Sequence, residues 1–205
     1  MTDYDSITAR NVPEATTVLK SAKVAIAGLG GLGSNIAVML ARIGVGKLFL
    51  VDFDKVEPSN LNRQHYNTKH LGMYKTEALK NQIGLINPFI ETEILTIKVE
   101  EENAAEIFAD YRIVCEAFDN PQYKSILVNA LLQNGNTKIV AASGMAGFDS
   151  ANRIKTECRF ENLYVCGDYV PAAEGGIGLM APRVAICAGH QANMVVRLIM
   201  NIKKV

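Results

Sequence analysis

The chain has 205 residues, of which 49% are hydrophobic and 20% are charged. This length suits one domain with a substantial buried core. The 21 basic residues balance the 21 acidic ones, so the chain has no overall charge that would favour nucleic acid or a membrane surface. We therefore expect one domain over residues 1–205, with neither nucleic acid nor membrane as a partner.

The first twenty residues are polar and lack the apolar core of a signal peptide, and no apolar run approaches the roughly 18 residues of a membrane span. A cytoplasmic protein is expected. The four cysteines, Cys115, Cys158, Cys166 and Cys187, form no C-x-x-C pair. This spacing predicts reduced thiols, two of them buried, and no zinc site.

After an N-terminal helical segment over residues 1–22, the stretch Lys23 to Asp54 predicts a β-α-β unit. A short apolar run enters a glycine-rich turn, a helix follows from about Ser34 to Arg42, and a strand from Lys47 to Val51 ends at Asp52. Glycines let the backbone approach a phosphate, and a helix N-terminus attracts anions. The unit therefore indicates a nucleotide site, formed by Gly28, Gly30, Gly31, Gly33 and Asp52.

The rest of the chain alternates strands and helices. Helices are expected at Lys75 to Ile86, Glu101 to Tyr111, Pro121 to Asn134 and Arg183 to Ile202, and strands at Glu91 to Val99, Arg112 to Phe118 and Lys138 to Ala142. This order predicts an α/β, Rossmann-like, doubly wound and mostly parallel sheet with helices on both faces. Residues 144–181 are interpreted as an irregular crossover segment, with one or two strands near Asn152 to Phe160.

Residues 53–74 show no periodicity and are rich in hydrogen-bond donors, and a loop of this length inside a domain is often functional. It places Asn60 and Arg63 shortly before Lys75, at a predicted helix start. An amide and two cations beside a nucleotide favour a triphosphate over a dinucleotide. Asp119, at the end of a neighbouring strand, is a candidate ligand for Mg²⁺. Together these residues indicate chemistry at an α-phosphate.

Other interpretations stay open. The glycine turn with Asp52 also fits an NAD(P)-binding oxidoreductase, although no His or Tyr is placed as its general acid. A non-catalytic nucleotide-binding protein would share the fold without turnover. Asp52 and Asp119 could instead cap backbone N–H groups, and Arg63 and Lys75 could be solvated surface charges.

Several short motifs, in order, resemble those of the ThiF/MoeB/HesA enzymes, the bacterial relatives of ubiquitin-activating enzymes. The chain looks most like the compact ThiF enzymes of thiamine biosynthesis. The motifs are GLGGLGSN at 28–35, DFDKVE at 52–57, SNLNRQ at 59–64, GMYK at 72–75, INP at 86–88, DN at 119–120, GLMAPR at 178–183 and HQAN at 190–193.

The resemblance implies adenylation by ATP of the C-terminal glycine carboxylate of a ThiS-like, ubiquitin-like sulfur carrier protein, with release of pyrophosphate. It implies a homodimer that uses ATP and Mg²⁺ in the synthesis of the thiamine thiazole. By position, Asp52 would bind the ribose, and Asp119 would carry Mg²⁺. The remaining nucleotide contacts would come from Asp54, Asn60, Arg63, Gln64 and Lys75.

Three features depart from the family pattern. The four-cysteine zinc site is absent, and so is the arginine that follows the Asp119-type acid, where Lys124 is the nearest cation. Arg10 is the nearest match to an arginine that the partner subunit supplies in the family. Cys166, in the crossover segment, is the candidate for a catalytic cysteine, because a mobile loop there would bring it to the adenylate. His190 is expected at a helix surface or an interface.

Overall fold

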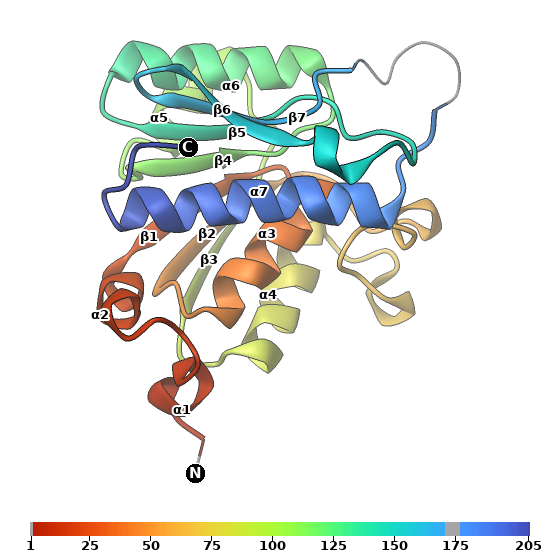
Figure 1. Ribbon diagram of the computed structural model, residues 1–205. Coiled ribbons are helices and arrows are strands. Elements are labelled where there is room, and N and C mark those ends of the chain that lie inside the picture. Colours follow the sequence, from red (N-terminus) through yellow and green to blue (C-terminus); the bar gives the residue numbers. More distant parts are fainter. Residues whose placement is uncertain (1, 171–176) are drawn as a thin grey trace.

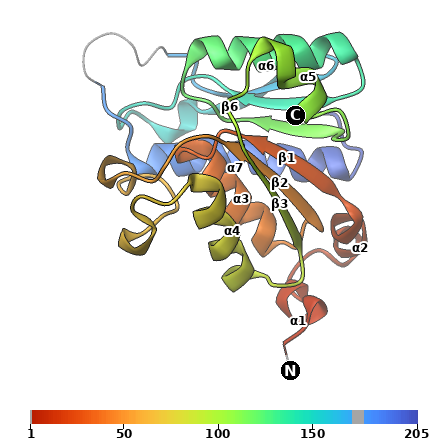
Figure 2. The ribbon, with the colours of Figure 1, turned by 180° about the vertical axis from the view of Figure 1, so that it is seen from behind.

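The computed structural model describes residues 2–170 and 177–205, which form a seven-stranded sheet with helices on both faces (Figures 1 and 2). The strand order is β3-β2-β1-β4-β5-β7-β6. Neighbouring strands are parallel except β6, which runs antiparallel to β7. The α/β, Rossmann-like and mostly parallel sheet expected from the sequence is confirmed.

The observed elements lie within a few residues of the expected ones. The strands are β1 (Lys23–Ala27), β2 (Lys47–Asp52), β3 (Glu91–Thr96), β4 (Ile113–Glu116), β5 (Lys138–Ala142), β6 (Lys155–Phe160) and β7 (Leu163–Gly167). The helices are α1 (Tyr4–Thr8), α2 (Pro13–Ser21), α3 (Gly31–Arg42), α4 (Lys75–Ile86), α5 (Glu101–Ile107), α6 (Pro121–Asn134) and α7 (Ala181–Ile199). Helices α1 and α2 both lie within the N-terminal helical segment expected over residues 1–22.

The predicted crossover segment, residues 144–181, includes residues 171–176, which lie outside the described residues; its described part is more regular than the sequence suggested. It contains β6 and β7, a hairpin that adds two strands to one edge of the sheet. Strand β7 was not predicted. Its five residues follow β6 after a short turn and form a short apolar run without an alternating pattern. The hairpin extends the sheet beneath the middle of α7, and α7 contacts both of its strands.

Alternating side chains of the strands build two hydrophobic cores, one on each face of the sheet. From β1, Val24 and Ile26 join the core under α3, α4 and α7, whereas Ala25 and Ala27 join the core under α5 and α6. The two views show these helix groups on opposite faces (Figures 1 and 2). Successive residues of a strand point to opposite faces, so both faces of a central strand must be apolar.

The N-terminal helices pack at the end of the sheet where the central strands begin. The Tyr4 hydroxyl donates to the carbonyl of Gly44 at 2.6 Å, and the Asn11 amide donates to that of Ile43 at 2.8 Å. Both carbonyls follow the last turn of α3. The opposite end of α3, about 18 Å away for twelve residues, holds the glycine turn.

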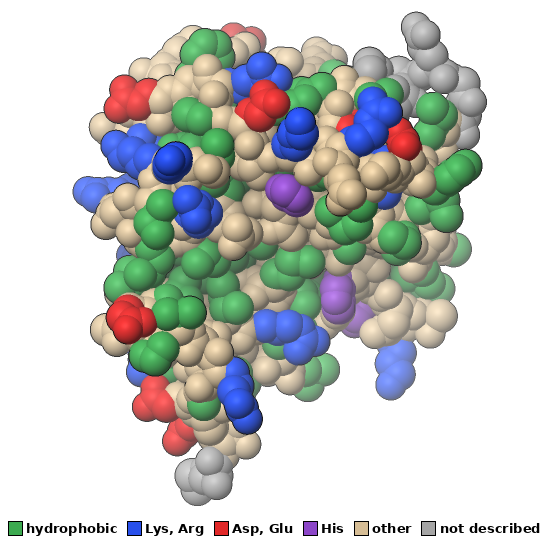
Figure 3. All heavy atoms as spheres, viewed as in Figure 1, with side chains coloured by type: hydrophobic (Ala, Val, Ile, Leu, Met, Phe, Trp, Pro, Cys, Tyr) green, Lys and Arg blue, Asp and Glu red, His purple; other side chains and the backbone are tan. Residues whose placement is uncertain are grey.

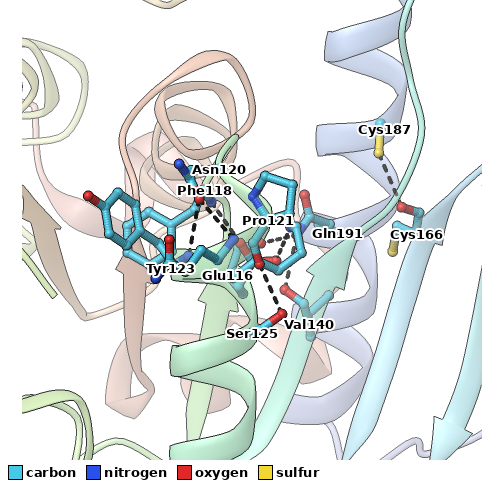
Figure 4. A network of polar contacts seen from close by, with 12 residues as sticks. Glu116, Phe118, Asn120, Pro121, Tyr123, Ser125, Val140, Cys166, Cys187 and Gln191 are labelled. Atoms are coloured by element: carbon cyan, nitrogen blue, oxygen red, sulfur yellow. Dashed lines mark hydrogen bonds and ion pairs between the residues drawn. The ribbon is translucent and has the colours of Figure 1, made fainter. Parts of the chain in front are cut away.

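A buried polar network joins α6 and α7 to the ends of β4 and β5 (Figure 4). The side chain of Glu116 is fully buried, accepts from the Phe118 N–H at 2.8 Å and pairs with the ammonium of Lys124. From α7, the amide of Gln191 donates to the carbonyls of Glu116 and Val140, each at 3.0 Å. Burial raises the pKa of Glu116, while Lys124 opposes the rise. Lys124, the cation nearest to Asp119 in the motif, is thus committed to Glu116.

Helix α7 is the longest helix of the described residues, yet neither it nor any other described helix combines the length and apolarity needed to cross a bilayer. The cytoplasmic location stays a prediction.

Replacing Lys124 by Met should destabilise the protein by about 2 to 4 kcal/mol at pH 8, because it leaves the buried Glu116 carboxylate without its counter-ion. Without Lys124, the folded-state pKa of Glu116 rises further. As the pH falls, Glu116 is protonated and loses its buried charge, so part of the lost stability is restored. The destabilisation should therefore be smaller at pH 5 than at pH 8. Urea unfolding of both proteins at the two pH values measures it.

The matched control is Lys98→Met, which breaks the exposed pair between Lys98 and Glu100. That variant should change stability little at either pH. Equal unfolding midpoints for Lys124→Met and the parent at pH 8 would show that the Glu116 pair does not stabilise the fold.

Candidate functional site

The glycine turn brings three segments of backbone into contact. Gly28 has φ of +87°, and a Cβ there would lie 2.9 Å from the backbone of Ala117, which follows β4. A Cβ on Gly33 would lie 1.8 Å from the carbonyl oxygen of Gly28. Glycine is therefore required at both positions. The turn delivers α3 so that its N-terminus lies at the carboxyl ends of β1, β2 and β4, and no side chain caps it at Gly30.

Asp52 supports this turn from the end of β2. One carboxylate oxygen accepts from the Leu29 N–H at 2.6 Å and the other from the Asp54 N–H at 2.8 Å. Its side chain is buried, and burial raises the pKa of Asp52 against the opposing charge of Lys75. The capping role weighed for Asp52 is thus present. Each carboxylate oxygen has a second lone pair and can accept another hydrogen bond, so these backbone bonds leave room for a ribose hydroxyl. Contact between Asp52 and a ribose stays a prediction.

The loop after β2 wraps around the glycine turn. From α3, the Asn35 amide donates to the carbonyl of Arg63 at 3.1 Å, and the Ser34 hydroxyl accepts from the His65 N–H at 2.9 Å. The Tyr66 hydroxyl donates to the carbonyl of Leu29 at 2.8 Å. These bonds hold Arg63 and Gln64 against Gly30 and Gly31.

Two buried polar atoms in this loop have no hydrogen-bond partner among the described residues: Nε of Arg63 and Oε1 of Gln64. Arg63 otherwise donates through Nη1 to the carbonyl of Ser59 at 3.1 Å and to the Asn62 side chain at 2.9 Å. A buried group without a partner costs about 1 to 3 kcal/mol. The Nε–H of Arg63 can donate to a phosphate oxygen bound beside the helix N-terminus. The Oε1 of Gln64 is an acceptor, so it would need a donor such as a hydroxyl or amino group of the same ligand.

Lys75 and Asp54 also meet at this edge of the sheet. Lys75 is the first residue of α4, its side chain is 7% exposed, and its ammonium lies 2.7 Å from the half-exposed Asp54 carboxylate. Asn60 lies in the same loop, where its side-chain oxygen accepts from the Glu57 N–H at 3.1 Å. The surface-charge interpretation of Lys75 is wrong, because a buried ammonium paired to one carboxylate is a positioned group.

Asp119 lies just beyond β4, exposed to solvent and two residues after Ala117, which touches Gly28. The next residue, Asn120, caps α6 by accepting from the Gln122 N–H at 2.8 Å. No cluster of three or more His, Cys, Asp or Glu side chains in the described parts of the chain is arranged to hold a metal. Mg²⁺ bound by one carboxylate and substrate phosphates needs no such cluster, so Asp119 as its ligand stays a prediction.

Arg10 is the one predicted site residue that the fold does not bring to this edge. It is exposed between α1 and α2, beside Asn11, which is bonded to the far end of α3. One copy of the chain therefore cannot present Arg10 to its own glycine turn.

The structure corrects the interpretation of Cys166 as a loop residue. Cys166 lies in β7 and is fully buried, and the Cys187 thiol of α7 donates to its carbonyl at 3.5 Å (Figure 4). Burial raises the pKa of Cys166 to about 11 and that of Cys187 to about 12. A thiol of this kind is a poor nucleophile at neutral pH. Three of the four cysteines are buried instead of two, and Cys158 is exposed.

An ion pair that the sequence does not indicate joins Arg183 and Asp168, whose side chains are 4% and 5% exposed. Arg183 lies in the first turn of α7, and its neighbour Val184 packs against Gly31. Fifteen residues separate the two charges, so no local spacing could have signalled the pair. The pair anchors the start of α7 beside the glycine turn. His190, lower on α7, is half-buried and bonded through Nδ1 to the Thr156 hydroxyl at 3.0 Å.

This arrangement defines an α/β domain with a candidate nucleotide site at its glycine turn, and comparison with known proteins identifies its family. The sequence model of the ThiF family matches residues 4–205, so the chain belongs to the ThiF family.

Two curated relatives illustrate the match. The adenylyltransferase and sulfurtransferase UBA4 of Candida glabrata is 40% identical over 128 residues, which are 62% of this chain and 29% of that protein. The molybdopterin-synthase adenylyltransferase of Haemophilus influenzae is 41% identical over 130 residues, which are 62% of this chain and 52% of that protein. The match thus spans between about a third and a half of these relatives.

Among solved structures, the E. coli tRNA N6-threonylcarbamoyladenosine dehydratase TcdA in complex with ATP superposes with a TM-score of 0.86 at 21% identity. The superposition covers 97% of this chain and 93% of TcdA. E. coli MccB with ATP gives a TM-score of 0.73 at 22% identity and covers 92% and 58% of the two chains. At these identities the likeness establishes the fold.

The burial of the thiols yields a direct test. In the native protein at pH 8, iodoacetamide should modify one thiol per chain, that of Cys158, because the other three are shielded and their pKa values are raised. Intact-mass spectrometry measures the result. The variant Cys158→Ser should gain no label until the protein is unfolded in guanidinium. Rapid labelling of Cys166 in the native protein would contradict its burial.

Proposed function

We propose that the chain adenylates the C-terminal glycine carboxylate of a small ubiquitin-like carrier protein, using ATP. The observation that carries the proposal is the pair of buried, unpartnered atoms of Arg63 and Gln64 beside an uncapped helix N-terminus. The positioned ammonium of Lys75 lies at the same edge of the sheet. Membership of the ThiF family and the names of the adenylyltransferase relatives support the same reaction.

The chemistry requires charge stabilisation more than proton transfer. A carboxylate oxygen of the carrier attacks the α-phosphorus, and the bond from that phosphorus to the oxygen bridging to the β-phosphate breaks. The products are an acyl-adenylate and pyrophosphate, and the attacking carboxylate has no proton to lose. Backbone N–H groups of the glycine turn, Arg63 and Lys75 would hold the phosphates. Mg²⁺, with Asp119 as a ligand, would neutralise charge on the leaving group.

Lys75 would exchange its partner during binding. With Asp54 only half-buried, the pair is open to solvent on one side, and a triphosphate offers the ammonium more negative charge than one carboxylate. Asp54 would then be free to accept from the nucleotide or from a bound water.

The substrate is proposed as a class. A ThiS-like carrier in thiamine thiazole synthesis is the narrower form of the proposal, and it rests on the sequence motifs alone. The curated relatives carry names from molybdopterin synthesis and sulfur transfer, and TcdA, which shares the fold, is named as a tRNA N6-threonylcarbamoyladenosine dehydratase. Membership of the ThiF family argues against an NAD(P)-dependent oxidoreductase. Measured turnover of ATP would distinguish an adenylating enzyme from a protein of the same fold that only binds nucleotide.

Exchange of labelled pyrophosphate into ATP, dependent on a carrier ending in Gly-Gly, tests the proposal. The variants Lys75→Ala and Asp119→Ala should each lower the exchange rate by about 10²- to 10³-fold, because each removes charge stabilisation that the reaction centre needs. The matched control is Lys80→Ala, which removes an exposed lysine from the same helix as Lys75.

Normal exchange in both site variants would overturn the assignment of the site. Absence of exchange by the parent protein with every Gly-Gly carrier tested, ThiS-like carriers included, would overturn the function. Circular dichroism of each variant verifies that the fold is retained.

A role for Arg10 at the nucleotide would require a homodimer, in which each copy supplies its Arg10 to the site of the other copy. Because the fold holds Arg10 at the far end of α3, its action on the nucleotide requires a second copy. Arg10→Ala and Lys75→Ala should each be inactive alone, and an equal mixture should recover up to about one quarter of the parent exchange rate, since half of the dimers carry one intact site. No recovery after verified subunit exchange would exclude Arg10 as a shared residue.

A further inference from the structure

A cavity lies at the opposite end of the sheet from the glycine turn. Its volume is about 950 Å³, and it opens where β1, β4 and β5 begin, bordered by the ends of α2 and α7. Lys23, Ile113 and Lys138, the first residues of those three strands, line it. A volume of this size accommodates a small organic ligand. None of the residues assigned to the nucleotide site lines this cavity.

The lining of this cavity is strongly basic. Lys23, Arg112, Lys138 and Lys203 contribute four cationic side chains, and Asp110 is the one acidic residue among the lining residues. The whole chain has a net charge of zero, so this concentration is local. Lys and Arg side chains gather in the space-filling view beyond the end of α7, at the left of Figure 3.

Most of these cations have no protein partner. Within residues 2–170 and 177–205, Lys23, Arg112 and Lys203 make no side-chain hydrogen bond and no ion pair, whereas the Lys138 ammonium donates to the Asn162 side chain. These like charges around one cavity repel one another, and an anion bound between them would replace that repulsion by attraction.

Helix ends offer the simplest alternative explanation. Helices α2, α6 and α7 end near this cavity, and the negative end of a helix dipole attracts cations. Lys23, Arg112 and Lys203 donate to none of the last carbonyls of those helices among the described residues. Their N–H groups therefore stay free to donate to a ligand, whatever the helix dipoles contribute.

Apolar residues also line the cavity. Val18, Ile113, Leu198 and Ile199 line it together with the cations. A site that combines an apolar surface with a few convergent charges recognises an organic molecule through its body and its ionised groups. Arg112 supplies a planar fork that suits phosphate oxygens, and the lysines supply mobile point charges.

We propose that this cavity binds a small organic anion that carries phosphate groups. The site is separate from the nucleotide site and does not depend on the proposed function. The two sites are divided by the length of the strands, so a ligand here contacts neither Lys75 nor the glycine turn. Arg112 and Lys203, both exposed and unpaired, make the main contacts with the phosphates.

Fructose 1,6-bisphosphate is a suitable probe, since it carries two phosphates and no base. Titrated into the full chain at constant ionic strength, it should produce saturable shifts in backbone amide resonances at residues 21–23, 109–113, 136–138 and 198–203. The double variant Arg112→Gln/Lys203→Gln should raise the Kd at least about tenfold, because two charge-assisted contacts are lost.

The matched control is Arg42→Gln/Lys80→Gln, which removes an exposed arginine and an exposed lysine from α3 and α4, away from the cavity. Its Kd should stay within about twofold of the parent value. Shifts confined to the glycine turn, shifts that do not saturate, or equal weakening by the two double variants would each overturn the proposal.

Discussion

The close approach of backbone at Gly28 is the constraint on which the rest of the structure depends. The end of β1, the start of α3 and the segment after β4 meet there at distances that leave no room for a Cβ on Gly28 or Gly33. This contact orients α3 so that its unpaired N–H groups face the carboxyl ends of the central strands. It also brings Ala117, and with it the segment that carries Asp119, beside the turn. A side chain at Gly28 would separate all three elements.

Two buried carboxylates and two side chains with buried, unpaired atoms lie around this contact. Asp52 and Glu116, at the ends of β2 and β4, each accept from backbone N–H groups, and each is influenced by a lysine. Burial raises the pKa of both, so these bonds are what keep the ionised forms accessible. Arg63 and Gln64 differ, because each retains a buried atom with no partner in the described chain. The first two residues support the glycine turn and the end of β4, and the unpaired atoms of the second two belong to the proposed nucleotide site. The cavity proposed to bind an organic anion lies at the other end of the strands and shares no residue with that site.

Much of this site was predictable from sequence because its residues follow strand ends and helix starts. The glycines, Asp52 and Lys75 are predictable from the glycine-rich turn, a strand end and a helix start, and the sheet brings them together as expected. Arg63 was inferred from the donor-rich loop, and Asp54 and Gln64 from the motif resemblance. The bonds to Asn35 and Ser34 that hold the loop could not be anticipated, since donor and acceptor lie about thirty residues apart. Cys166 was misplaced for a related reason. Its strand β7 is stabilised by pairing with β5 and β6, which no local pattern reports.

By itself, the sequence determined the order of the strands and helices apart from β7, the mostly parallel α/β class and the presence of a glycine turn, because these depend on local propensity and hydrophobic period. The tertiary structure decided which charged groups are buried and with whom they pair. The Lys124–Glu116 and Arg183–Asp168 pairs join residues 8 and 15 positions apart, and the basic cavity gathers residues from 18 to 203. Such encounters depend on how elements pack and on the low dielectric that packing creates, and neither is encoded in any single stretch of the chain.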